Sequence, residues 1–169
     1  MSTGRLTGVF IFIAATTLVV SACGGSQSAE KPKSDSAFAE MQKRGQMAMG
    51  VDQYASRHKF DITADGGRIE LQRDKQDSLG VAQIRAHMKL IQHAFEAGDF
   101  STPAFVHMRD MPGTALMSTK RDAIKYVYGD LPLGAEVRIS TKDPSALAAI
   151  REFLNAQRSD HHAGGMTMH

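Results

Sequence analysis

The chain has one cysteine among its 169 residues, Cys23, and no tryptophan. A lone cysteine excludes a framework of disulfides and a metal site made of several thiolates. A surplus of either charge is also missing, since 20 Lys and Arg residues face 18 Asp and Glu residues. Such a balance provides no basic field for nucleic acid and no polybasic patch for a membrane surface. The composition therefore predicts no nucleic-acid partner.

The chain has only one long apolar run, and it lies near the amino terminus. The run follows Arg5, extends from Val9 to Val20 and ends in Val20-Ser21-Ala22-Cys23. An apolar core of about a dozen residues between a charged start and a small-residue cleavage site is typical of an export signal. A membrane-spanning helix needs about 20 apolar residues, so an uncleaved anchor is disfavoured. The stretch resembles a bacterial lipoprotein signal peptide with its lipobox.

This resemblance implies that residues 1–22 are removed and that Cys23 carries the lipid. The sulfur would be diacylated and the new amino terminus acylated, for example with palmitate. Each buried methylene contributes about 0.8 kcal/mol, so two or three acyl chains would anchor the protein permanently. Gly24 follows the cysteine in place of the aspartate associated with inner-membrane retention. We therefore expect a periplasm-facing envelope protein, with the outer membrane favoured.

The mature chain divides into three parts by composition. Residues 23–36 are small and polar and predict a flexible tether. Residues 37–160 predict one α+β domain, although the start of this domain, residues 37–54, is ambiguous because two glycines interrupt its helical pattern. Its methionines are interpreted as apolar residues that fill gaps rather than as ligands. Residues 161–169 form a tail rich in histidine and methionine.

The domain contains an internal repeat with a spacing of 66 residues. Alternating apolar residues around Asp65-Gly66-Gly67 predict a β-hairpin, and a helix capped by Asp77 or Ser78 follows and ends at Gly98. The second half repeats this order, with turn residues from Gly129 to Gly134 and a helix that starts behind Asp143. We predict a tandem ββα repeat that builds a four-stranded antiparallel sheet with two helices on one face.

The two halves are joined by a long connection, Asp99 to Arg121. It exceeds the usual length of a connection without secondary structure. We therefore expect it either to contain a short element or to form part of a site.

Two histidines stand at apolar positions of the repeat. His58 corresponds to Ile124 and His87 to Phe153, so we expect both to point toward the buried side, whereas His93 faces solvent. A buried imidazole is neutral, and it is either hydrogen-bonded or bound to a metal ion. Both interpretations stay open: two separate core histidines, or part of a metal site.

Two further histidines lie where they could join such a site. His107 is in the long connection, and His161 follows the last helix. Four neutral imidazoles from a strand, a helix, a loop and a helix end could bind copper or zinc. The tail could also act alone, because mixed imidazole and thioether ligands suit Cu(I); the alternative is a disordered polar end. The candidate tail ligands are His161, His162, Met166, Met168 and His169.

The domain also resembles a family of small exported bacterial proteins of unestablished activity, some of which carry an automatic aspartate carbamoyltransferase label. The resemblance covers most of residues 49–164, and its matching stretches include Met49 to Gln53, His58 with Phe60, Asp65 to Gly67, Ile84 to Met88, Ala97 to Phe100, His107, Pro112 and Gly113 with Met117, and Phe153 to His161. It implies that His58, His87, His107 and His161 belong together. It implies no reaction.

Catalysis is not expected from this chain. Carbamoyl transfer needs a phosphate clamp of several cations and helix-terminal amides, and the Ser-Thr-Arg-Thr motif and second domain of such enzymes are missing. Neither a Gly-x-Ser-x-Gly elbow nor a His-Glu-x-x-His motif occurs. The Asp74/Asp77 and Asp110/Asp122 pairs fit caps and turns better than a pair of catalytic carboxylates.

Two hypotheses about function follow. In the first, the protein is a lipid-anchored envelope protein that binds a transition metal ion, copper before zinc, through its histidines. In the second, it is a metal-free module with structural histidines that binds a small ligand or another envelope protein. The distances between the four imidazole rings distinguish the two hypotheses. Four rings around one point favour a metal ion, and scattered rings do not.

Overall fold

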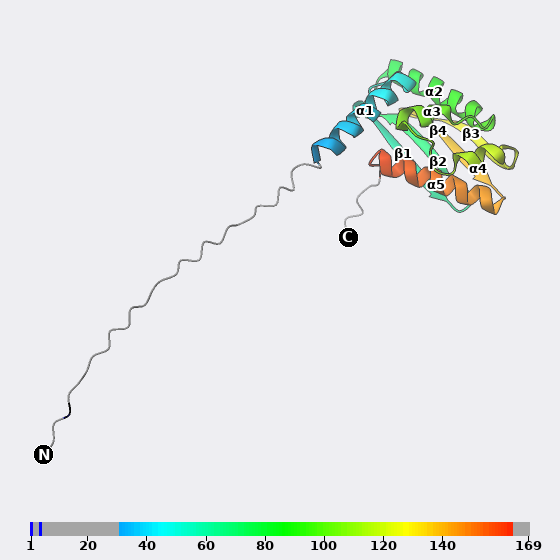
Figure 1. Cartoon of the computed structure of the whole chain (residues 1–169). Coiled ribbons are helices and arrows are strands. Elements are labelled where there is room, and N and C mark those ends of the chain that lie inside the picture. Colours follow the sequence, from blue (N-terminus) through cyan, green and yellow to red (C-terminus); the bar gives the residue numbers. More distant parts are fainter. Residues whose placement is uncertain (2–3, 5–30, 164–169) are drawn as a thin grey trace.

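The computed structural model describes Met1, Gly4 and residues 31–163 (Figure 1). The predicted export signal, the lipidation site Cys23 and the tail residues Met166, Met168 and His169 lie outside the described residues. Within the described part of the chain, none of the helices combines the length and the apolar character needed to cross a membrane.

The predicted fold class is confirmed. Four strands form one antiparallel sheet in the order β1-β2-β4-β3, and helices pack on it. The strands are β1 (Ser56–Thr63), β2 (Gly66–Arg73), β3 (Ile124–Leu131) and β4 (Gly134–Thr141). The predicted turn from Gly129 to Gly134 is shorter than expected, because β3 continues to Leu131 and leaves only two linking residues.

The two long helices start at the predicted caps. In α2 (Ser78–Glu96) the carboxylate of Asp77 accepts a hydrogen bond from the Gly80 N–H, and in α5 (Pro144–Asp160) Asp143 accepts from two N–H groups of the first turn. Such caps satisfy backbone donors that a helix start otherwise leaves free. Both helices bury an apolar side against the sheet. The core has at its centre Leu71, Ile84, Val137, Ile139, Ile150, Phe153 and Leu154.

Each long helix packs mainly on the hairpin of the other repeat unit. Helix α2 lies over β3 and β4, and α5 lies over β1 and β2. Arginines reinforce this exchange: Arg85 of α2 donates to the carbonyl oxygens of Leu131 and Gly134, and Arg151 of α5 donates to that of Ala64. The two ββα units therefore depend on each other and form one core.

The remaining elements lie at one end of the sheet and around the helices. Helix α1 (Lys31–Met49) begins inside the stretch for which a tether was predicted, and it continues through Gly45, where the side chain of Gln53 packs against it. The turn η1 (Gln53–Ala55) leads into β1. Arg44 of α1 donates to the carbonyl oxygen of Val106 at 2.8 Å, so α1 is tied to the connection between the units.

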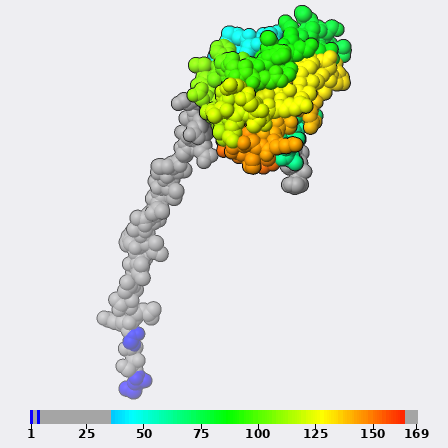
Figure 2. Space-filling model, turned by 90° about the vertical axis from the view of Figure 1, so that its right-hand side faces the viewer, coloured from blue at the N-terminus to red at the C-terminus, as the bar shows by residue number. Residues whose placement is uncertain are grey.

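That connection contains secondary structure of its own, as one of the two expectations proposed. It forms α3 (Ser101–His107), α4 (Thr114–Thr119) and the turn η2 (Arg121–Ala123). In the space-filling view its yellow-green surface separates green α2 from orange α5 (Figure 2). The connection thus covers the core between the two long helices.

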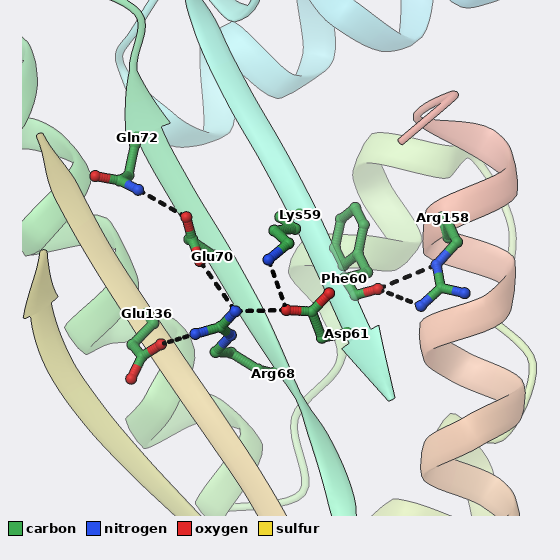
Figure 3. Close-up of polar contacts among 8 residues, drawn as sticks. All are labelled: Lys59, Phe60, Asp61, Arg68, Glu70, Gln72, Glu136 and Arg158. Carbon is green, nitrogen blue, oxygen red and sulfur yellow. Dashed lines mark hydrogen bonds and ion pairs between the residues drawn. The ribbon is translucent and has the colours of Figure 1, made fainter. Parts of the chain in front are cut away.

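The opposite face of the sheet is polar. At its centre Arg68 of β2 lies within ion-pair distance of Asp61, Glu70 and Glu136, which come from three strands (Figure 3). At the free edge, Arg158 of α5 donates two hydrogen bonds to the carbonyl oxygen of Phe60 in β1. This guanidinium covers part of an edge that would otherwise be open to another strand.

Candidate functional site

The four candidate histidines line one cavity. His58 comes from β1, His87 from α2, His107 from the end of α3, and His161 from the residue that caps α5. The cavity has a volume of about 70 Å³. Its other walls are largely apolar and include Phe60, Ile69, Leu71, Ile91, Phe95, Val106 and Phe153.

The rings gather around His161. Its ring centroid lies 4.6 Å from that of His58, 5.1 Å from that of His107 and 5.4 Å from that of Phe60. The backbone of Ala48, in α1, is hydrogen-bonded to the ring of His87. Six separate elements of the fold, β2 among them, therefore contribute to one small site, which only the folded chain brings together.

The repeat shows what the histidines replace. Ile124, Phe153 and Phe95 stand 66 residues after His58 and His87 and 66 residues before His161, respectively, and all three belong to the apolar core. The ring contact between Phe95 and Tyr126, at 5.9 Å, has its counterpart in the contact between His161 and Phe60. The histidine cavity thus lies at the place that hydrophobic side chains fill in the other half.

Burial keeps the imidazoles neutral. It lowers the pKa of His58 and of His87 to about 4, with the neighbouring imidazoles His87 and His107 adding to the effect at His58. It lowers the pKa of His161 to about 2, again with a contribution from the nearby rings. A charged imidazole in this setting would lose its hydration and meet like charges. Neutral rings at physiological pH leave lone pairs for a hydrogen bond or a metal ion.

His107 has hydrogen-bond partners at both ring nitrogens. Its side chain is 2% exposed, and its Nδ1 lies 2.8 Å from the carboxylate of Asp160. Its Nε2 lies 2.9 Å from the side-chain oxygen Oε1 of Gln157. Asp160 also accepts a hydrogen bond from Arg109 at 2.6 Å. Burial lowers the pKa of His107, although the Asp160 carboxylate acts in the opposite direction.

The other rings are less engaged. Within residues 31–163, neither His58 nor His161 has a hydrogen bond through a ring nitrogen; both rings make aromatic contacts instead. No group of three or more His, Cys, Asp and Glu side chains in the described part of the chain is placed to hold a metal ion. An ion would therefore require these rings to turn from their present positions.

The sequence did not point to several residues of the site. Met49 and Met88 line the cavity, as does Gln157, and Asp160 holds His107 from outside. The methionines were assigned to the core on hydropathy, which does not separate a gap-filling thioether from a ligand. The position of Asp160 directly before His161 was the available signal.

Not all candidate residues reach the cavity. His162 is exposed, and its ring stacks on Phe38 of α1 with centroids 4.5 Å apart. His93 is exposed on α2, as predicted, with Nδ1 3.6 Å from Glu96. The tail candidates Met166, Met168 and His169 lie outside the described residues.

Fold and site together define an α+β domain of two interlocked ββα units with a small cavity lined by histidines. Comparison of the chain with protein-family models, with curated proteins and with solved structures finds no match. The resemblance to small exported bacterial proteins therefore stays a prediction.

Proposed function

We propose that the protein is a lipid-anchored cell-envelope protein that binds a transition metal ion, copper before zinc, in the histidine cavity. The observation that carries the proposal is the meeting of His58, His87, His107 and His161 around one cavity. His58, His87 and His161 stand where the repeat places hydrophobic residues, and polar rings at such positions are costly without a ligand. Because they are neutral, they need not lose a proton before they bind an ion.

The size of the cavity favours an ion over an organic ligand. Sites for small molecules commonly measure about 300–1,000 Å³, whereas this cavity measures about 70 Å³. Nitrogen ligands lie about 2.0–2.1 Å from a zinc ion. The centroids of the His58 and His107 rings lie 4.6 and 5.1 Å from that of His161, so these rings would have to turn toward a common point to bind one. The metal-free alternative would leave this space to water or to a molecule of a few atoms.

The chemistry of the walls favours copper, and Cu(I) in particular. Met49 and Met88 add thioether sulfurs to the imidazoles that line the cavity. Thioethers are soft ligands that prefer Cu(I) to Zn²⁺. The tail, with His162, Met166, Met168 and His169, offers a second set of the same ligand types, and we propose that it collects or passes ions at the surface.

Cu(I) binding tests the cavity directly. The mature chain with Cys23→Ser, ended at Ala163 to remove Met166, Met168 and His169 of the tail, is expected to bind one Cu(I) in competition with a chromogenic chelator. The double variant His58→Ile/His87→Phe places the side chains of the other repeat half in the cavity. It should lose at least about 100-fold in affinity and gain about 0.5–2 kcal/mol in stability, as filled cavities commonly do.

The exposed histidine provides the matched control. His93→Ala changes a ring on the outer side of α2 and should leave affinity and stoichiometry as in the parent chain. Equal Cu(I) affinity in the parent and in the double variant, with both folded by circular dichroism, would exclude the cavity as the binding site. The metal-free alternative would then be favoured.

Lipidation of Cys23 is a separate prediction. In a host with the lipoprotein pathway, the full chain should incorporate labelled palmitate and migrate at the mass of a chain that starts at residue 23. Cys23→Ser should incorporate none, because the sulfur is the acceptor. Label in both proteins, or in neither, would contradict the anchor.

A further inference from the structure

We infer that Gln157 holds the place of the ion at His107, and that Asp160 turns the His107 ring so that the lone pair of Nε2 faces the cavity. The inference rests on the proposed function and adds its regulation. It assigns a role to two residues that the sequence pattern did not single out, one inside the cavity wall and one behind it.

The role of Asp160 follows from hydrogen-bond chemistry. An ionised carboxylate only accepts hydrogen bonds, so the Nδ1 of His107, 2.8 Å from Oδ2, must carry the hydrogen. A neutral ring has one N–H, which leaves the lone pair on Nε2. Arg109, 2.6 Å from the same Oδ2, holds the carboxylate in place from the outer side. Carboxylates that orient a histidine in this way are common behind metal-bound imidazoles.

The role of Gln157 follows from its position. The atom nearest to Nε2 of His107, the nitrogen that an ion would use, is the amide oxygen Oε1 of Gln157 at 2.9 Å, and the residue is only 6% exposed. Gln157 and His107 line the cavity together with His161. With Nδ1 protonated, Nε2 accepts a hydrogen bond only if Gln157 turns its NH₂ group toward it. An ion that enters must replace this hydrogen bond, and the amide then has to leave.

The hydrogen bond between Gln157 and His107 lowers the affinity for an ion, because the ion must break it. A buried hydrogen bond contributes about 0.5–1.5 kcal/mol net, which corresponds to roughly a 2- to 12-fold change in a binding constant. While the cavity is empty, Gln157 provides the hydrogen-bond partner of Nε2 of His107. We expect the contact to weaken binding of every ion to the same degree, so that it adjusts affinity rather than metal preference.

The Gln157→Leu variant tests the competition. It removes the amide while preserving most of the side-chain volume, and the affinity for Cu(I), measured against a chromogenic chelator in the tailless Cys23→Ser chain, should rise about fivefold. Gln53→Leu is the matched control, because Gln53 is equally buried at 3% exposed and lies outside the cavity lining. Unchanged or weaker Cu(I) binding in Gln157→Leu, relative to Gln53→Leu, would overturn the role of Gln157.

The Asp160→Asn variant tests the orientation. Its NH₂ group can donate to Nδ1, so the ring should populate both tautomers, and Cu(I) affinity should fall about 10- to 100-fold. Asp143→Asn is the control at the other end of the same helix, where the carboxylate caps the first turn and pairs with Lys120. Long-range ¹⁵N spectra of the metal-free parent chain should show the hydrogen of His107 on Nδ1; a hydrogen on Nε2 would overturn the role of Asp160.

These measurements separate the inference from the proposed function. If the parent chain binds neither Cu(I) nor Zn²⁺, the proposed function is wrong, and the role of Gln157 is wrong with it. The tautomer spectrum would still decide the role of Asp160. If the parent chain and the Gln157→Leu variant bind Cu(I) with the same affinity, only the role of Gln157 is wrong.

Discussion

Acidification is expected to unfold the domain between about pH 5.5 and pH 4. His58 and His87 have a pKa of about 4 in the folded protein, and His161 one of about 2, against about 6.5 in an unfolded chain. Between these values the unfolded chain binds more protons, so stability is fully present above pH 6.5 and falls as the pH decreases. Each histidine removes about 1.4 kcal/mol per pH unit in this range.

The surroundings of the rings determine the size of this effect. His58 faces the imidazoles of His87, His107 and His161, which repel a proton, and the carboxylate of Asp160 contacts only His107. Three uncompensated rings would lower the free energy of unfolding by roughly 4 kcal/mol per pH unit. A domain whose stability is about 5–10 kcal/mol, in the lower part of the usual range, reaches its midpoint within about one to two and a half units below pH 6.5.

Urea unfolding at a series of pH values measures this slope. In the His58→Ile/His87→Phe variant the slope below pH 6 should decrease by about two protons, and the acid midpoint should move to lower pH. The number of protons taken up is the decisive quantity, because filling the cavity also raises stability at neutral pH. Equal slopes in the parent and in the variant would show that these rings are not buried in neutral form.

Gly113→Ala is expected to destabilise the domain by about 3 kcal/mol or more, within the range of the largest single-substitution effects. Gly113 has φ 81°, and a Cβ there would lie 2.1 Å from the carbonyl oxygen of Ala149 in α5. The substitution therefore adds a steric clash to backbone strain. Helix α4 would be forced away from α5, whose end carries Asp160 and His161.

A second glycine separates the two contributions. Gly50 has φ 73°, but the nearest side-chain atom to its Cβ, in Gln83, would be 3.7 Å away. Gly50→Ala should therefore cost only the backbone strain, about 1–2 kcal/mol. Chemical denaturation of both variants measures the difference. Equal losses would mean that α4 and α5 can separate without cost.

Local patterns predicted most of the fold. The alternation around Phe60 and Tyr126, the caps at Asp77 and Asp143 and the repeat spacing depend on neighbours in sequence, and the observed strands and helices follow them. The tether was predicted to extend to residue 36, whereas α1 begins at Lys31. The boundary was missed because no local signal separates a polar helix from a polar linker.

The site was predicted in part. The positions of His58 and His87 in the repeat indicated their inward direction, and the structure places both on the cavity wall with His107 and His161. Gln157 was not predicted, because on a helical pattern it is one polar residue among several, and only the approach of α3 to α5 gives it a buried partner. Met49 and Met88 were interpreted as core for a similar reason.

The sequence by itself determined the elements, their order and the repeat, because period, caps and turns act between residues close in the chain. It also determined which rings occupy apolar positions. Only the tertiary structure decided that each helix covers the hairpin of the other unit, and that α1, α3 and the end of α5 meet over β1. Such choices depend on the packing of distant surfaces, whose shape no local pattern records.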